Sequence, residues 1–326
     1  MHICIIGAGA MGGLYGGLLA RDGVEVTALD SWADHVAAIA RDNLHLDGIT
    51  GDLRIPLKAV TDPDAVAPAD IVFIQTNTNA TEEAAQAAKR ILKPGGYAIT
   101  LQNGVGNLET LIAALGRERV LGGLSYHSAE PKGPGHVTHT HAGPTWIGEL
   151  DGTRSERVQA LAAMLTSAGF KPTIVDNIEG FIWNKFIHNS AINALCAVTG
   201  LRVGEIPRTP AADEMQTRVI EETLAVVAAK GIALPDSDPM ATIKGFCRKK
   251  FNKPSMLQHM EMGKRTEIDA LNGAVVREGR ALGIATPYND ALTMLTKACE
   301  THRIQLLHGP AIDYAALERE VTAEIA

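Results

Sequence analysis

The first twelve residues constrain the fold of this chain more than any other segment. His2–Ile6 is a short apolar run typical of a buried strand, and the pattern G-x-G-x-x-G follows it directly as Gly7-Ala8-Gly9-Ala10-Met11-Gly12. In this pattern the first glycine permits a tight turn, the second lets the backbone approach a pyrophosphate, and the third lets the next helix pack on the strand. The N–H groups and the dipole at the start of that helix also attract phosphate. The segment therefore predicts a dinucleotide-binding loop, with a glycine-rich turn that binds no ligand as the alternative.

Composition and charge limit the classes of protein that this sequence allows. A chain of 326 residues is expected to form about two domains. The net charge of −7 argues against a general nucleic-acid-binding surface. No apolar run reaches the roughly 18 residues of a membrane span, no signal peptide precedes the first strand, and the four cysteines form no C-x-x-C pair. We therefore expect a cytoplasmic protein with reduced thiols and without membrane or nucleic-acid partners.

The first half of the sequence alternates strand-like and helix-like segments, which predicts an α/β fold with a doubly wound parallel sheet of the Rossmann type. We expect strands at 2–6, 24–29, 70–75 and 97–101, and helices at Met11–Asp22, Trp32–Arg41 and Thr81–Leu92. Glycine-rich alternation predicts antiparallel strands at Val120–Ser125 and His136–Ile147 that close the edge of this sheet. A helix at Arg154–Ala168 and a last strand at Pro172–Val175 complete this half.

The second half is almost free of strand signals. Helical periodicity covers 179–198, 211–230, 240–251, 255–282 and 289–307, and one more short helix follows Pro310. We therefore predict a dinucleotide-binding domain at 1–175 and an all-helical substrate domain at 176–326, with the ligand cleft between them. The long helices are able to pair two chains into a homodimer, although their apolar stripes serve an internal core equally well.

Asp30 ends the predicted second strand, about 20 residues after the glycine motif. A carboxylate at this point accepts hydrogen bonds from the ribose hydroxyls of NAD and repels the 2′-phosphate of NADP. No arginine follows it in Asp30-Ser31-Trp32-Ala33-Asp34. We therefore expect NAD rather than NADP. The alternative is that Asp30 caps the next helix, a role that Ser31 fills equally well.

Three further groups of polar residues stand out. Lys185, Asn189 and Asn193 are spaced by four on a helix that is otherwise largely apolar, and such a stripe needs polar partners, which a ligand cleft would supply. Asn103 lies in the turn Gln102-Asn103-Gly104 after a strand, either as an ordinary turn residue or at the sheet edge where ligands bind. Taken alone, Ser255 is as readily explained as a helix N-cap as by a role in a site. Glu267 is as readily explained as a surface acid as by such a role.

Histidines cluster at His136, His139 and His141, in a segment that alternates like a strand. No cysteine or carboxylate lies at a spacing that matches a metal site. We therefore expect solvated strand and loop histidines and no metal ion, with a metal site as the alternative.

Four motifs together resemble the ketopantoate reductase (2-dehydropantoate 2-reductase) family: G-A-G-A-M-G, Q-N-G-V-G-N, W-N-K-F-I-H-N-S-A-I-N-A-L and P-S-M-L-Q-H-M-E-M-G-K-R-T-E-I-D-A-L-N-G. They occur in the family's order and span nearly the whole chain. The resemblance implies a Rossmann domain followed by a helical domain. It also implies the reduction of a small 2-keto acid, ketopantoate, to a 2-hydroxy acid with NADPH, a step of pantothenate biosynthesis.

The resemblance implies roles for individual residues. Lys185 matches the catalytic lysine that donates a proton, and Glu267 matches a glutamate that assists catalysis. Asn103 matches an asparagine near both nicotinamide and substrate. The matched substrate contacts are Asn189, Asn193, Asn252 and Ser255, the serine holding the carboxylate. The cofactor contacts are Gly7, Ala8, Gly9, Ala10, Met11, Gly12, Asp30, Asn77 and Asn103.

Two departures from the family pattern affect the cofactor. The family usually carries a lysine where this chain has Asn77, and a basic residue after the second strand, where this chain has Asp30 and Ser31. Both changes remove positive charge and favour NAD. The alternative enzyme is therefore an NAD-dependent D-2-hydroxyacid dehydrogenase acting on a branched or aromatic 2-keto acid. A sensor that binds NAD(P) without turnover is the non-enzymatic alternative, and the presence of Lys185 and Glu267 argues against it.

Overall fold

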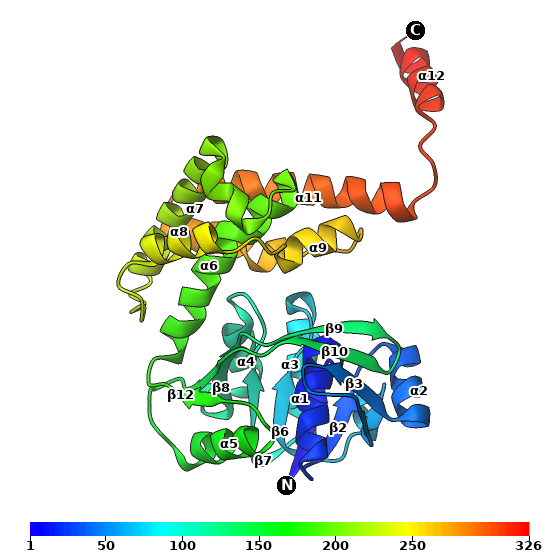
Figure 1. The fold of residues 1–326 in the computed structure, drawn as a ribbon, viewed down its shortest axis with the longest axis vertical. Coiled ribbons are helices and arrows are strands. Elements are labelled where there is room, and N and C mark those ends of the chain that lie inside the picture. The colour runs from blue at the N-terminus through cyan, green and yellow to red at the C-terminus, as the bar shows by residue number, and fades with distance from the viewer. Residues whose placement is uncertain (326) are drawn as a thin grey trace. The chain divides into compact units, whose positions relative to one another are not determined.

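The computed structural model describes residues 1–325 and divides the chain into two compact units (Figure 1). The first unit consists of residues 1–187 and 227–237, and the second consists of 188–226 together with the chain from Asp238 onward. The α/β class with a helical C-terminal region is confirmed. The sequence-based domain boundary near residue 175 stays a prediction.

The main sheet of the first unit has eight strands in the order β12-β11-β8-β7-β6-β1-β2-β5. Its strands are β1 (His2–Ile6), β2 (Glu25–Leu29), β5 (Lys58–Val60), β6 (Ala69–Ile74), β7 (Leu92–Thr100), β8 (Val120–Ser125), β11 (Thr145–Glu149) and β12 (Pro172–Ile174). All neighbours pair in parallel except β8 and β11, which are antiparallel. The helices that accompany the sheet are α1 (Ala10–Arg21), α2 (Ala33–Asp42), α3 (Thr81–Ile91), α4 (Asn107–Leu115) and α5 (Glu156–Ser167). Because the strands from β5 to β8 are parallel, their carboxyl ends meet at one edge of the sheet.

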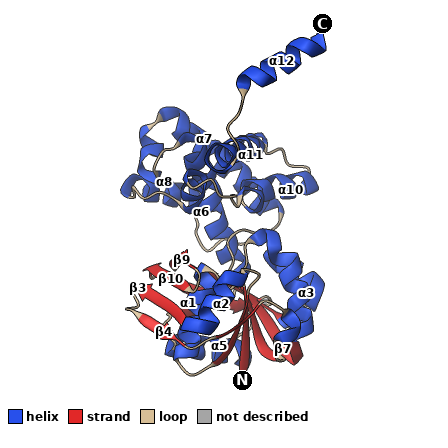
Figure 2. Ribbon diagram, turned by 90° about the vertical axis from the view of Figure 1, so that its right-hand side faces the viewer, coloured by secondary structure: helices blue, strands red, loops and turns tan. Residues whose placement is uncertain are grey.

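A second sheet of four strands has the order β4-β3-β10-β9 (Figure 2). Its strands are β3 (Leu44–Gly48), β4 (Leu53–Ile55), β9 (Ser128–Gly133) and β10 (His136–His141). The predicted single strand at His136–Ile147 is therefore wrong: it divides into β10 and β11, which belong to different sheets. The interruption is Ala142-Gly143-Pro144, where proline lacks the N–H that a strand ladder needs. The strands β3, β4, β5 and β9 were not predicted from the sequence.

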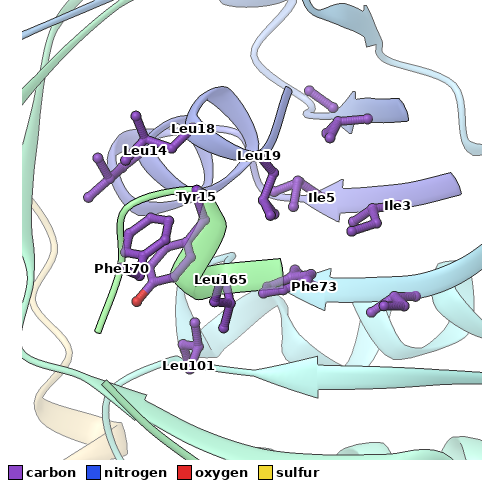
Figure 3. Packing of buried hydrophobic residues seen from close by; sticks show 14 of the residues in the cluster. Ile3, Ile5, Leu14, Tyr15, Leu18, Leu19, Phe73, Leu101, Leu165 and Phe170 are labelled. Carbon is purple, nitrogen blue, oxygen red and sulfur yellow. The ribbon is translucent and has the colours of Figure 1, made fainter. Parts of the chain in front are cut away.

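Helix α1 packs into the core of the first unit through Tyr15. Figure 3 shows Tyr15 lying face to face with Phe170, with ring centroids 4.2 Å apart and an angle of 5° between the rings. The Tyr15 hydroxyl is buried and lies 3.0 Å from Ser125 Oγ and 2.9 Å from Thr145 Oγ1. These contacts connect the core to the carboxyl end of β8, where Ser125 is the last residue.

The second unit is helical. Its elements are the part of α6 (Ile178–Thr199) from His188 on, α7 (Pro210–Ala229) up to Val226, α8 (Pro239–Lys249), α9 (Ser255–Glu261), α10 (Asn272–Leu282), α11 (Pro287–His308) and α12 (Tyr314–Ile325). Short 3₁₀ turns in the two units are η1 (Pro63–Ala65), η2 (Thr78–Ala80), η3 (Arg117–Arg119), η4 (Val203–Arg208) and η5 (Ile268–Ala270). Within residues 1–325, no helix is both long and apolar enough to cross a membrane.

The predicted continuous helix at 255–282 is wrong, because α9, η5 and α10 occupy this range separately. Gly263 has a φ of +63° and directs the chain out of α9, a conformation that glycine adopts readily after a helix. The predicted short helix after Pro310 is confirmed by α12.

Candidate active site

The glycine loop is closely packed at its first and last glycine and open in the middle. Gly7 has a φ of +88°, and a Cβ there would lie 2.6 Å from the backbone nitrogen of Thr76. A Cβ on Gly12 would collide with the carbonyl oxygen of Gly7, whereas a Cβ on Gly9 would meet no atom within 4 Å. No described side chain caps the start of α1. The loop therefore offers bare backbone and free N–H groups to a phosphate at Gly9.

Asp30 lies directly after β2 and contacts the glycine loop. Its carboxylate accepts hydrogen bonds from the Ala8 N–H at 2.6 Å and from the Trp32 N–H at 2.8 Å. The N-cap of α2 is Trp32, and no side chain caps that helix, so the alternative role of Asp30 or Ser31 as helix cap is wrong. A carboxylate has about four acceptor sites, so Asp30 keeps sites for further donors such as ribose hydroxyls.

His35 is a part of this loop that sequence analysis missed. It is fully buried, its Nε2 lies 3.0 Å from the carbonyl oxygen of Ala8, and the Gly135 N–H donates to its Nδ1 at 2.9 Å. These two bonds fix the neutral tautomer that carries its proton on Nε2. Asp30 and His35 thus hold the Ala8 residue at its N–H and its C=O. A single histidine on a helix gives no sequence signal for such a role.

The turns after β6 and β7 are tied together by Gln102. Its amide nitrogen donates to the Thr76 carbonyl at 2.7 Å and to Thr81 Oγ1 at 3.0 Å, and its oxygen accepts from Thr100 at 2.8 Å. The two predicted site residues of these turns, Asn77 and Asn103, are both exposed. Gln102 therefore fixes the backbone that carries Asn103. This role of Gln102 was not predicted from the sequence.

Lys185 lies in the part of α6 that belongs to the first unit. Its Nζ donates to the carbonyl oxygen of Ser125 at 2.5 Å and lies 5.0 Å from the centroid of the Tyr126 ring. A carbonyl oxygen and an aromatic face both attract a cation. Because β8 runs parallel to β7, this ammonium group is held at the same sheet edge as the glycine loop, Asp30 and Asn103.

Aromatic side chains form one wall of a pocket beside Lys185. Tyr126 meets Trp146 edge to face at 5.5 Å, and Trp146 lies 5.7 Å from Phe181. Burial raises the pKa of Tyr126. The pocket is lined by Leu124, Tyr126, Trp146, Phe181, Asn184, Pro235 and Asp236. Among the described residues, the buried Oδ1 of Asn184 has no hydrogen-bond donor, so this wall carries one unsatisfied acceptor.

The remaining predicted residues lie in the second unit. Asn193 is buried and Asn189 is half-buried, both on the face of α6 that carries Lys185. Asn252 and Ser255 are exposed, and Glu267 is half-buried before η5. The N-cap of α9 is Pro254, so the alternative role of Ser255 as that cap is wrong. The assembly of these five residues with Lys185 stays a prediction.

The histidine cluster differs from the expectation in one respect. His139 is only 2% exposed, so its predicted solvation is wrong, whereas His141 is exposed. The Nε2 of His139 lies 3.0 Å from Nδ1 of His127. Burial, with smaller contributions from His139 and His141, lowers the pKa of His127 to about 4. His136 is partly exposed and pairs with Asp47 at 2.8 Å.

Comparison with known proteins agrees with this arrangement. Residues 3–152 match the family model described as "Ketopantoate reductase PanE/ApbA", and residues 177–300 match its C-terminal counterpart. The chain is 34% identical to the 2-dehydropantoate 2-reductase of Pyrococcus horikoshii, over 92% of this chain and 98% of that protein. It is 32% identical to the enzyme of the same name from Halobacterium salinarum, over 92% and 99% of the two chains.

Solved structures show the same likeness. A PanE/ApbA family ketopantoate reductase from Ralstonia eutropha has a TM-score of 0.86 and 37% identity, covering 93% of this chain and 99% of that one. D-mandelate dehydrogenase, solved with NADH and anilino(oxo)acetate, has a TM-score of 0.85 and 28% identity with the same coverage. Since the relatives exceed 30% identity along nearly their whole length and both family models match in order, this chain belongs to the ketopantoate reductase family of NAD(P)-dependent oxidoreductases.

Proposed function

We propose that this protein reduces 2-dehydropantoate, a small 2-keto acid, to the corresponding 2-hydroxy acid. The observation that carries the proposal is the position of Lys185, whose ammonium group is held by the Ser125 carbonyl at the sheet edge that also bears the glycine loop. The curated relatives are named 2-dehydropantoate 2-reductase, which supports this substrate.

The residues present fit a nicotinamide dinucleotide. The open space at Gly9 and the uncapped start of α1 suit a pyrophosphate, with Gly7, Ala8, Ala10, Met11 and Gly12 forming the rest of the loop. We propose that Asp30 accepts hydrogen bonds from a ribose and that Asn77 and Asn103 contact the cofactor farther along the same edge. The carboxylate of Asp30 repels a 2′-phosphate, so we propose a preference for NAD over NADP.

The bound cofactor supplies the hydride that reduces the C2 carbonyl. Lys185 stabilises the negative charge that develops on the carbonyl oxygen and donates the proton that completes the alcohol. An alkoxide is far more basic than lysine, whose ordinary pKa is about 10.4, so this proton transfer is favourable. General acid catalysis of this kind contributes about 10²- to 10⁴-fold to the rate.

The other predicted residues position the substrate. We propose that Asn103, Asn189 and Asn193 hydrogen-bond to it, that Ser255 holds its carboxylate with Asn252 nearby, and that Glu267 assists Lys185 or binds a substrate hydroxyl. Positioning of this kind accounts for a large part of the rate enhancement in bimolecular reactions. We also propose the division at residue 175 into a dinucleotide-binding domain and a substrate domain, and association into a homodimer through the second.

A second candidate function is that of an NAD-dependent D-2-hydroxyacid dehydrogenase acting on an aromatic 2-keto acid. The observation that favours it is the wall of Tyr126, Trp146 and Phe181 beside Lys185, which suits a ring. The similarity to D-mandelate dehydrogenase, which was solved with NADH, also supports it.

The oxidation of NADH and of NADPH, measured with ketopantoate and with phenylglyoxylate, tests both candidates. The first candidate predicts that kcat/KM is highest for ketopantoate, and a clear preference for phenylglyoxylate favours the second. If neither compound nor any other 2-keto acid is reduced, both candidates are wrong.

A further inference from the structure

The small sheet carries a group of histidine and aspartate side chains on its outer face. Its strands β3 and β10 pair in parallel, with His45 directly opposite His136 and Asp47 opposite Thr138. Because side chains alternate along a strand, these four lie on one face, while Leu44 and Leu46 are buried on the other. Two segments about 90 residues apart in sequence therefore bring two imidazoles and a carboxylate together.

The side chains of this group contact one another directly. His136 Nε2 lies 2.8 Å from an oxygen of Asp47, and the two imidazole rings of His45 and His136 stack with their centroids 3.9 Å apart. His45, Asp47 and His136 each offer one ligand atom, and these three atoms lie within 4.8 Å of one another. Their side chains are 16%, 30% and 30% exposed, so solvent and ions reach them.

The surroundings of the group also suit a cation. Asp52, in the turn between β3 and β4, accepts a hydrogen bond from His45 at 2.7 Å and supplies a second carboxylate. The Thr138 hydroxyl donates to the other oxygen of Asp47 at 2.5 Å, which orients that carboxylate in the way that outer hydrogen bonds orient metal ligands. Arg54 lies opposite His45 on β4. The group therefore has one neighbouring cation and two carboxylates, Asp47 and Asp52.

We propose that His45, Asp47 and His136 form a binding site for a Zn²⁺ ion, with Asp52 or water as the fourth ligand. Zinc takes imidazole nitrogen at about 2.0–2.1 Å and carboxylate oxygen at about 2.0–2.2 Å in a tetrahedral arrangement. To bind it, the two rings turn out of their stacked position so that their lone pairs meet at one point, a movement that these partly exposed side chains allow. The ion links β3 to β10.

This link connects to the glycine loop. Gly135, which precedes β10, donates to His35, and His35 bonds to the Ala8 carbonyl. An ion between His45 and His136 therefore stabilises the sheet that packs on α1.

Zn²⁺ titration of the full-length apoprotein by calorimetry tests the site, with His45→Gln and His136→Gln as test variants and His141→Gln as the control. His141 is an exposed histidine on the same strand that does not belong to the group. We expect the wild type and the control to bind one ion at this site, and each test variant to bind it at least about tenfold more weakly. Circular dichroism verifies that each variant folds. If only one of the two test variants folds, that variant alone tests the site.

Cobalt provides a second readout. Co²⁺ bound to the wild type should show the intense visible absorption of a tetrahedral site, and the two test variants should lose it. If both variants bind Zn²⁺ with the stoichiometry and affinity of the wild type, the histidine and aspartate side chains form ion pairs only, and the proposal is wrong.

Discussion

The ammonium nitrogen of Lys185 lies 2.5 Å from the carbonyl oxygen of Ser125, the last residue of β8. This contact connects the start of α6 to the carboxyl edge of the parallel sheet. Ser125 is itself held by the core, because its hydroxyl lies 3.0 Å from the buried Tyr15 hydroxyl. The same hydroxyl accepts a hydrogen bond from the backbone N–H of His127 at 3.1 Å. The proposed proton donor is thus held by a buried, hydrogen-bonded part of the first unit.

The cofactor preference is tested by Asp30→Ala. Loss of hydrogen bonds to a charged acceptor costs about 1.5–3 kcal/mol, so kcat/KM for NADH should fall about tenfold or more. The value for NADPH should fall less or rise, because the repulsion of its 2′-phosphate is removed. Asp34→Ala, an exposed acid on α2, is the control and should leave the ratio of the two values unchanged. An unchanged ratio in Asp30→Ala would show that Asp30 does not discriminate between the cofactors.

The glycine loop allows a matched pair of variants. Gly12→Ala should destabilise the fold by about 1–3 kcal/mol, because its Cβ collides with the Gly7 carbonyl. Gly9→Ala should cost less, about 1 kcal/mol, because its Cβ meets no atom and the cost is only that of alanine at a helix N-cap, yet it should weaken NADH binding. Urea unfolding and NADH titration measure the two effects. Unimpaired NADH binding by Gly9→Ala contradicts the placement of the pyrophosphate.

His35 is expected to position Ala8. His35→Phe removes both hydrogen bonds and leaves the Ala8 carbonyl and the Gly135 N–H without a partner, at a cost of about 1–3 kcal/mol for each buried group. We expect a lower free energy of unfolding and a higher dissociation constant for NADH, with kcat at saturating NADH nearly unchanged. Should kcat fall while NADH binds normally, His35 acts in the chemistry and not through the loop.

Acid should destabilise the protein through His127. Burial lowers its pKa to about 4 in the folded state, against an ordinary value of about 6.5. Between these values the unfolded chain binds a proton that the folded chain lacks, so stability is complete above about pH 6.5 and falls as the pH decreases toward 4. Urea unfolding over this range should show a weaker dependence on pH in His127→Gln than in the wild type. Parallel curves for the two proteins would contradict this cause.

Local patterns predicted the elements, and long-range contacts account for what was missed. Gly7, Gly9 and Gly12 lie within six residues, so their spacing is enough to predict the loop. The partners of His35 and Gln102 are set by the fold and lie up to 100 residues away, which no local pattern reveals. The same reason explains why the small sheet was not predicted, because its strands β3 and β10 pair across some 90 residues.

The candidate site shows the same division. The helical spacing of Lys185, Asn189 and Asn193 predicted one face of α6 correctly. The contact of Lys185 with Ser125 was not predictable, because it depends on where α6 meets β8. The break after α9 at Gly263 was missed because an isolated glycine inside a helical pattern is often tolerated.

Lys185→Ala, assayed for turnover and for NADH binding in the same preparation, is the decisive test of the proton donor. We expect kcat to fall by about 10²- to 10⁴-fold while the dissociation constant of NADH changes little, because Lys185 donates the proton and does not hold the dinucleotide. A kcat equal to that of the wild type would contradict the assignment of Lys185 as the proton donor.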